Sequence, residues 1–181
     1  MTALENYSLL IEGIFGKGVT TFDTTKDVNT QVINALNSAT EFSMFKANFI
    51  ARLQRLKRIY SPEPDYLKDI LVQVNQIADE NNWEGAFAEL AAYDFLNKTN
   101  PNRIHPIKPN VTIDMKQTYA YKLGKKEANL DGFVDDLDLY FDIKCFKDNV
   151  DEILEGIYKE VRVALGLDDY IIHAEYQMDV S

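Results

Sequence analysis

The chain has 181 residues, of which 46% are hydrophobic, and it carries a formal net charge of -10 at pH 7. This length and composition indicate an ordinary globular protein with one domain, or one domain with an appended helical region. The negative charge excludes a protein that coats nucleic acid by bulk electrostatics, because such proteins neutralise phosphates with Lys and Arg. A local nucleic-acid site is still compatible with it.

Neither a membrane segment nor a secretory signal is evident in the sequence. The apolar stretches fall short of the roughly 20 residues that a membrane helix needs. The N-terminus lacks a basic region followed by an apolar segment and a small-residue cleavage site. The single cysteine, Cys145, has no partner for a disulfide or a Cys-type zinc site and is expected to be a small buried residue. We therefore expect a cytoplasmic protein without a membrane partner.

Residues 1–80 have the apolar spacing of helices. Four helices are expected, with the inner faces Leu9, Leu10 and Ile14; Val28, Val32, Ile33 and Leu36; Phe42, Phe45, Phe49, Leu53, Leu56 and Tyr60; and Leu67, Ile70, Leu71, Val74 and Ile77. Pro62 and Pro64 end the third helix and allow the fourth to begin. A fifth helix, from Trp83 to Asn97, is expected after a cap at Asn81 or Asn82.

The pattern changes to that of strands after Pro101. Four runs rich in β-branched and aromatic residues follow, at residues 103–109, 111–121, 129–135 and 139–146. A helix from Asn149 to a C-cap at Gly166 and a last strand at residues 170–178 complete the chain. The last step needs a crossover connection, so we predict an α/β fold with a mixed central sheet flanked by helices. The expected regions are an N-terminal helical region, 1–80, and a core, 81–181.

Five aspartates interrupt the strand-like run at residues 130–146. Residues 135–138 are polar and turn-forming, so the runs on either side are expected to pair as an antiparallel hairpin. Its register sets Asp131 directly opposite Asp142 and puts Lys144 on the same face. Two opposed carboxylates repel, so a fold tolerates them only if one takes a proton or a cation lies between them. Mg²⁺ or Mn²⁺ suits such oxygen ligands.

The stretch LDGFV, followed eleven positions later by FDIKCF, resembles the PD-(D/E)xK motif of the restriction-endonuclease-like nucleases. The core order of that family is helix, strands, helix, strand. Leu130 stands where the motif often has proline. The family also places a glutamate on the helix before the sheet, and GAFAELAAYDFL supplies Glu89, on an apolar stripe with Ala86 and Tyr93. The resemblance covers residues 82–181 and predicts a restriction-endonuclease-like core.

The resemblance implies a metal-dependent nuclease that hydrolyses phosphodiester bonds of nucleic acid, with DNA as the expected substrate and Mg²⁺ or Mn²⁺ as cofactor. Asp131 would be the central metal ligand, and Asp142 and the carbonyl of Ile143 would be further ligands. Glu89 would bind the ion directly or through water. Lys144 would stabilise the pentavalent phosphorane or hold the attacking water. A homodimer is compatible with this activity, because cleavage of two strands usually takes two active sites.

Several of these residues have plainer alternatives. Lys144 could be an ordinary ion-pair partner of Asp142 or Glu127. Glu84 could replace Glu89, although its position in the first helical turn is already explained by the helix dipole. The following acids and histidines are expected to be structural: Asp135, Asp136 and Asp138 in the turn, and His105 and His173. A second acid-x-Lys triplet, residues 114–116, has no strand aspartate before it at hairpin distance and is assigned no chemistry.

A nuclease also has to hold a polyanion. No acidic residue lies between Phe42 and Pro62, and a second basic cluster precedes Asp131. From these two groups we predict nucleic-acid contacts at Lys46, Arg52, Arg55, Arg58, Lys125 and Lys126. The alternatives for the basic helix are a solvated face or a pairing surface for the acidic half of the chain.

Two other functions fit the same sequence. The core could be a nuclease-like domain that has lost catalysis and binds nucleic acid or protein. The chain could also be an unrelated α/β protein in which Asp131 and Asp142 bind a structural cation.

Overall fold

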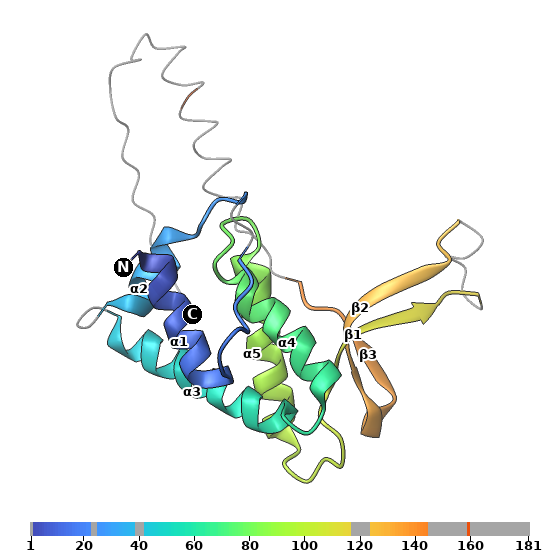
Figure 1. The fold of residues 1–181 in the computed structure, drawn as a ribbon. Helices are drawn as coiled ribbons and strands as arrows, with labels where there is room; N and C mark the ends of the chain where they lie inside the picture. Colours follow the sequence, from blue (N-terminus) through green and yellow to red (C-terminus); the bar gives the residue numbers. More distant parts are fainter. Residues whose placement is uncertain (1, 23–24, 39–41, 117–123, 145–158, 160–181) are drawn as a thin grey trace, which may run out of the picture. The chain divides into compact units, whose positions relative to one another are not determined.

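The computed structural model describes residues 2–22, 25–38, 42–116, 124–144 and 159. The described residues form five α-helices and a three-stranded sheet (Figure 1). The helices are α1 (Ala3–Phe15), α2 (Thr30–Asn37), α3 (Ser43–Tyr60), α4 (Pro64–Gln76) and α5 (Trp83–Thr99). The strands are β1 (Lys108–Asp114), β2 (Glu127–Val134) and β3 (Leu139–Phe141), with a 3-10 turn, η1 (Asp135–Leu137), between β2 and β3. All of them belong to one compact unit, Met1–Cys145.

Local signals in the sequence set the starts of several helices. At α1, the amide of Glu5 donates to Thr2 Oγ1 at 3.2 Å and the amide of Thr2 donates to Glu5 Oε2 at 2.6 Å, which is a reciprocal capping box. At α2, the side chain of Asn29 accepts the amide of Val32 at 3.1 Å. Pro64 is the first residue of α4, where a backbone N–H would have no partner within the helix.

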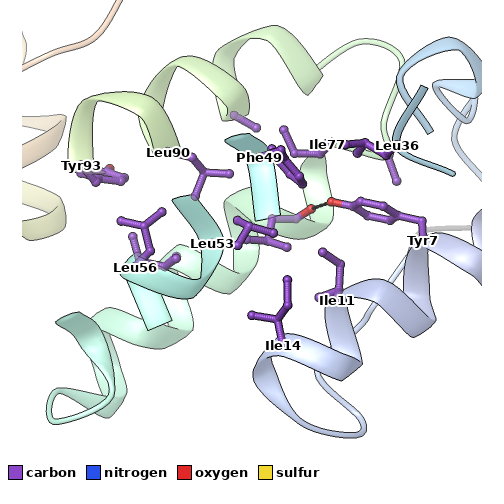
Figure 2. Packing of buried hydrophobic residues seen from close by; sticks show 14 of the residues in the cluster. Tyr7, Ile11, Ile14, Leu36, Phe49, Leu53, Leu56, Ile77, Leu90 and Tyr93 are labelled. Atoms are coloured by element: carbon purple, nitrogen blue, oxygen red, sulfur yellow. Dashed lines mark hydrogen bonds between the residues drawn. The ribbon is translucent and has the colours of Figure 1, made fainter. Parts of the chain in front are cut away.

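The helices share one hydrophobic core, shown in Figure 2. Its fully buried large side chains include Tyr7, Ile11, Ile33, Leu36, Phe49, Leu53, Leu56, Tyr60, Ile70, Ile77, Leu90 and Tyr93. The Tyr7 hydroxyl donates to the carbonyl of Val74 at 2.7 Å, which satisfies a polar group inside this core. The predicted inner faces of the second and fourth helices are confirmed at Val32, Ile33, Ile70 and Val74. Val28 was assigned to the second helix, but it precedes α2 and pairs with Asp79 in an isolated bridge.

Two residues of the predicted inner faces are exposed instead. Leu9 is 56% exposed, because α1 turns the stripe through Tyr7, Ile11 and Ile14 toward the core. Phe42 is 63% exposed. It precedes α3 with a left-handed backbone (φ 54°), so its side chain does not follow the helical stripe.

The start of α5 depends on Asp79 rather than on the predicted asparagine cap. Asn82 is the N-cap residue, but its side chain makes no capping bond and donates to Asp79 Oδ2 at 2.7 Å. The carbonyl of Asp79 accepts the amide of Trp83 at 3.0 Å. Hydrogen bonds from Lys26 and Asn82 lower the pKa of the Asp79 carboxyl to about 2. A buried carboxylate therefore holds the loop between α4 and α5.

The described strands form an antiparallel sheet in the order β1-β2-β3. The predicted α/β class is confirmed at this level. The predicted strand 170–178 lies outside the described residues, and so does the predicted helix 149–166 except for Lys159, which is helical. The division near residue 81 falls between α4 and α5 and stays a prediction.

The first predicted strand, residues 103–109, is wrong except for its last two residues. Helix side chains take both backbone groups of Ile107. The amide of Ile107 donates to Asn97 Oδ1 at 3.1 Å, and its carbonyl accepts the Tyr60 hydroxyl at 2.9 Å. These groups are therefore not available to a ladder, and β1 begins at Lys108.

Gly132 of β2 lies directly opposite Phe141 of β3, and a Cβ atom at this position would overlap the Phe141 ring. That ring packs edge-on against Tyr93, with centroids 6.4 Å apart. We expect Gly132→Ala to destabilise the fold by about 1–3 kcal/mol, because the ring must move out of its packed position. Urea unfolding measures this. Gly85→Ala is the matched control, since a Cβ there meets no atom within 4 Å, and equal stabilities for the two variants would contradict the expectation.

Candidate functional site

The hairpin of β2 and β3 brings Asp131 and Asp142 together. The register pairs Gly132 with Phe141 and Val134 with Leu139, as predicted, and Asp142 directly follows the last residue of β3. Burial and hydrogen-bonding contact with the Asp142 carboxylate raise the pKa of Asp131, although the amide of Ile143 donates to Asp131 Oδ2 at 2.5 Å. Two neighbouring carboxyl groups repel when both are ionised, which favours the protonated form of one of them. The two carboxyl groups therefore lie on the same side of the hairpin.

Lys144 lies beside this pair. Its Nζ atom is 2.5 Å from Asp142 Oδ2, and this hydrogen bond holds the pKa of the Asp142 carboxyl below its usual range. The side chain of Lys144 is 67% exposed, so the ammonium is within reach of a ligand from solvent. The contact with Asp142 is the ion pair that the plainer alternative expects, and the catalytic role of Lys144 stays a prediction.

Glu89 of α5 is part of the same electrostatic group. Burial raises the pKa of its carboxyl to about 7, with a further increase from the negative charges of Asp131 and Asp142. Hydrogen bonds from Tyr93 and Gln73 oppose the increase. Of the two candidate glutamates, Glu89 therefore interacts with the aspartate pair.

Glu89→Gln is expected to remove a pH dependence of the metal-free stability. Because the folded-state pKa is raised, this carboxyl contributes its full stability below the unfolded value of about 4.5 and loses it as the pH rises through about 7. We expect the wild type to lose about 1–2 kcal/mol relative to Glu89→Gln between pH 4.5 and pH 8, after allowance for solvent screening of a partly exposed group. Urea unfolding in EDTA at both pH values measures this, with Glu84→Gln as the matched control. Parallel pH profiles of the wild type and Glu89→Gln would contradict it.

Tyr93 joins α5 to β2. Its hydroxyl donates to the backbone carbonyl of Asp131 at 2.6 Å and lies 3.3 Å from Glu89 Oε2, within hydrogen-bonding distance of both oxygens. The side chain is 1% exposed, so its packing fixes the distance between the helix and the strand. Sequence reasoning placed Tyr93 on the stripe of Glu89 but gave it no role, although the spacing of four residues on one helix face was the available signal.

Helix α4 supplies a wall of the site that sequence reasoning missed. Asp69 and Gln73 line a pocket of about 110 Å³ together with Glu89, Tyr93, Asn110 and Asp131. Burial raises the pKa of Asp69, and a hydrogen bond from Asn110 of β1 opposes this. Gln73 reaches Glu89. The fourth helix belongs to the predicted N-terminal region, outside the family resemblance, and yet it contributes to this pocket.

The donor set of Asp131, Asp142 and Glu89 has the chemistry that a hard divalent cation prefers, since all its atoms are carboxylate oxygens. A cation could also relieve the repulsion between the two aspartates. In the part of the chain that the structure describes, however, no group of three or more His, Cys, Asp or Glu side chains is arranged to hold a metal ion. Metal binding by these residues and by the Ile143 carbonyl stays a prediction.

The basic residues of α3 have structural partners in several cases. Arg55 binds Asp94 through two hydrogen bonds of 2.8 and 2.7 Å, and Arg52 Nε lies 3.8 Å from the same carboxylate. The Arg52 guanidinium also lies 5.0 Å from the centroid of the Phe87 ring. Lys46 donates to the carbonyl of Ser38 at 3.4 Å. These contacts match the expected alternative of a pairing surface on α3.

The other predicted nucleic-acid contacts, Arg58, Lys125 and Lys126, are exposed. The acids of the turn were expected to be structural. Asp135 and Asp136 form η1 with Leu137, and Asp138 ends it with a left-handed backbone (φ 48°). Asp136 pairs with Arg103. His105 is exposed, and His173 lies outside the described residues.

The second acid-x-Lys triplet lies at the end of β1. Asp114 pairs with Lys116 at 3.0 Å, and both side chains are exposed. Asp114 lies opposite Glu127, at the far end of β2 from the hairpin turn. This triplet is therefore a matched control for the one at Asp142.

No helix among the described residues is long and apolar enough to cross a membrane. Comparisons with protein-family models, with curated proteins and with solved structures gave no match.

Proposed function

We propose that this chain is a metal-dependent nuclease that hydrolyses phosphodiester bonds, with DNA as the substrate that the family resemblance favours. One observation carries the proposal: the carboxyl groups of Asp131 and Asp142 meet on one side of the β2–β3 hairpin, with the Lys144 ammonium beside them. A chain that gains only stability from a hairpin has no need to place two carboxylates in contact.

The roles of the residues follow from their positions. Asp131, Asp142, the Ile143 carbonyl and Glu89 would hold Mg²⁺ or Mn²⁺. When bound, the ion would activate a water molecule and offset negative charge on the phosphate. Lys144 would stabilise the anionic phosphorane, and the exposure of its ammonium next to the carboxylates supports this role. Tyr93 bridges Glu89 and β2, since its hydroxyl contacts both the Glu89 carboxyl and the Asp131 carbonyl.

The test is a panel of plasmid, linear duplex and single-stranded DNA, and of RNA, incubated with Mg²⁺ or Mn²⁺. We expect cleavage of at least one substrate and its complete loss in EDTA, because in the proposed mechanism the bound ion activates the water. A parallel preparation of Asp142→Asn controls for contaminating nucleases. Failure to cut any substrate with either metal would overturn the proposal.

A second candidate is a nuclease-like module that binds nucleic acid or protein without cleaving it. The observation in its favour is that the Asp142 carboxylate is already neutralised by Lys144, and that the described residues contain no three-acid group arranged for a metal. Nucleic-acid binding without metal-dependent cleavage would support this candidate.

A further inference from the structure

An aromatic pair crosses from β2 to β3 next to the aspartates. Phe133 and Tyr140 are directly paired across the strands, with ring centroids 4.5 Å apart and planes tilted by 35°. Tyr140 is 43% exposed, so the pair is not absorbed into the hydrophobic core. It presents an accessible aromatic surface on the sheet.

This surface shares a sheet face with the candidate site. Phe133 lies two residues beyond Asp131 on β2, and Tyr140 lies on β3 two residues before Asp142, which directly follows that strand. Side chains two residues apart on a strand project from the same face, about 6.8 Å from one another. The aromatic pair and the carboxyl pair therefore form neighbouring rows, separated by a distance that one extended nucleotide can span.

The two rings line an open groove of about 490 Å³. Tyr66 of α4 and Lys108 of β1 also line it, together with the carboxylates of Glu63 and Asp135. Tyr66 lies on the same helix as Asp69 and Gln73, so α4 contributes residues both to this groove and to the pocket at Asp131. The groove thus adjoins the candidate site.

The charges of the groove indicate which part of a nucleotide fits it. Lys108 is opposed by Glu63 and Asp135, so the lining is not positive overall and does not suit a phosphate. Aromatic rings favour stacking with a flat, uncharged ring. Carboxylates accept hydrogen bonds from the amino groups of nucleobases. An aromatic base with its amino edge toward the carboxylates would stack on the rings and donate to Glu63 or Asp135.

We propose that this groove binds an unpaired nucleobase beside the scissile phosphate, so that the substrate of the site is single-stranded nucleic acid. A base inside a duplex is stacked between its neighbours and cannot reach a protein ring, whereas an unpaired base can. The inference rests on the proposed nuclease function for the position of the phosphate, and on the groove itself for the base.

The test measures binding separately from cleavage. Fluorescence anisotropy with a labelled single-stranded oligonucleotide, in EDTA and again with Ca²⁺, gives the affinity of the chain and of its variants. We expect Tyr140→Ala to weaken binding by about 5- to 150-fold, the range expected for loss of one stacked base. Tyr140→Trp is expected to restore it, because it keeps the ring. Phe95→Ala is the matched control, since Phe95 is an aromatic residue of α5 that is 64% exposed.

An oligonucleotide with one base removed at successive positions locates the contact. We expect one abasic position to weaken binding to the wild type and to have no further effect on Tyr140→Ala. Equal affinities for Tyr140→Ala and Phe95→Ala, or no single-strand binding by the wild type in either condition, would overturn the groove. If binding depends on Tyr140 but no substrate is cleaved with Mg²⁺ or Mn²⁺, the nuclease proposal is refuted and the proposed base-binding groove stands. If the chain cleaves nucleic acid but Tyr140→Ala leaves binding unchanged, the groove proposal is refuted and the nuclease proposal stands.

Discussion

Asp142→Asn is expected to lower the rate of phosphodiester cleavage by about 10³-fold or more while leaving the fold intact. The asparagine amide removes one negative charge from the Asp131–Asp142 pair and breaks the ion pair with Lys144. The proposed cation site therefore loses a ligand, and Lys144 loses its counter-charge. Loss of a single preorganised electrostatic group typically costs 10²–10³ in rate, and loss of a metal ligand adds to this. Single-turnover cleavage with excess protein measures the chemical step directly.

Stability separates the possible meanings of that result. Asp142 is exposed, and its replacement removes repulsion with Asp131, so we expect a change within about 0.5 kcal/mol. The matched control is Asp114→Asn, which breaks the equivalent Asp114–Lys116 pair at 3.0 Å and is expected to keep full activity. Wild-type cleavage by Asp142→Asn would refute the assigned site. A large fall in melting temperature on substitution, without any cleavage by the wild type, would indicate a structural cation instead.

Asp94→Asn is expected to destabilise the fold by about 2–4 kcal/mol. Asp94 is 3% exposed and binds Arg55, Lys98 and, at longer range, Arg52. Burial alone would raise the pKa of Asp94, but these cations outweigh it and keep the pKa below its ordinary value. Removal of the anion leaves two partly buried guanidinium groups without their counter-charge, which is costly. Urea unfolding at pH 7 measures the loss.

The contacts of Asp94 also predict how its contribution to stability depends on pH. Because the pKa of Asp94 is depressed in the folded state, its contribution is present above the unfolded value of about 3.9 and is lost as the pH falls through the folded value. The difference between wild type and Asp94→Asn should therefore shrink in acid. Lys98→Ala, at the 50% exposed end of the cluster, is expected to cost less than about 1 kcal/mol. A change below about 0.5 kcal/mol for Asp94→Asn would instead leave Arg52 and Arg55 free for the predicted nucleic-acid contacts.

The hairpin was predictable because its information is local. Residues 135–138 are turn formers between two short runs of strand residues, and a side-chain period of two leaves few choices of register. The pairing of Val134 with Leu139 follows the prediction, and with it the meeting of Asp131 and Asp142. The helical stripes were predictable for the same reason, since a period of 3.6 relates neighbours within one element.

Contacts between distant elements were not predictable in this way. The sequence has no pattern that joins Asp94 to Arg55, which lie 39 residues apart, or that directs the Tyr93 hydroxyl to the carbonyl of Asp131. The prediction of a strand at residues 103–109 was wrong for this reason, because helix side chains form hydrogen bonds with both backbone groups of Ile107. Basic residues on α3 suggested a nucleic-acid surface, and burial of Asp94 gave two of them another partner.

The amino-acid order alone was enough to place Asp131, Asp142 and Lys144 on one face, since they belong to a single turn-closed ribbon with a short-range repeat. Packing of helices against that ribbon added Glu89 with its pKa near 7, the Tyr93 bridge and the α4 wall at Asp69 and Gln73. Burial and Coulomb interactions depend on which surfaces meet in space, and no local period encodes that.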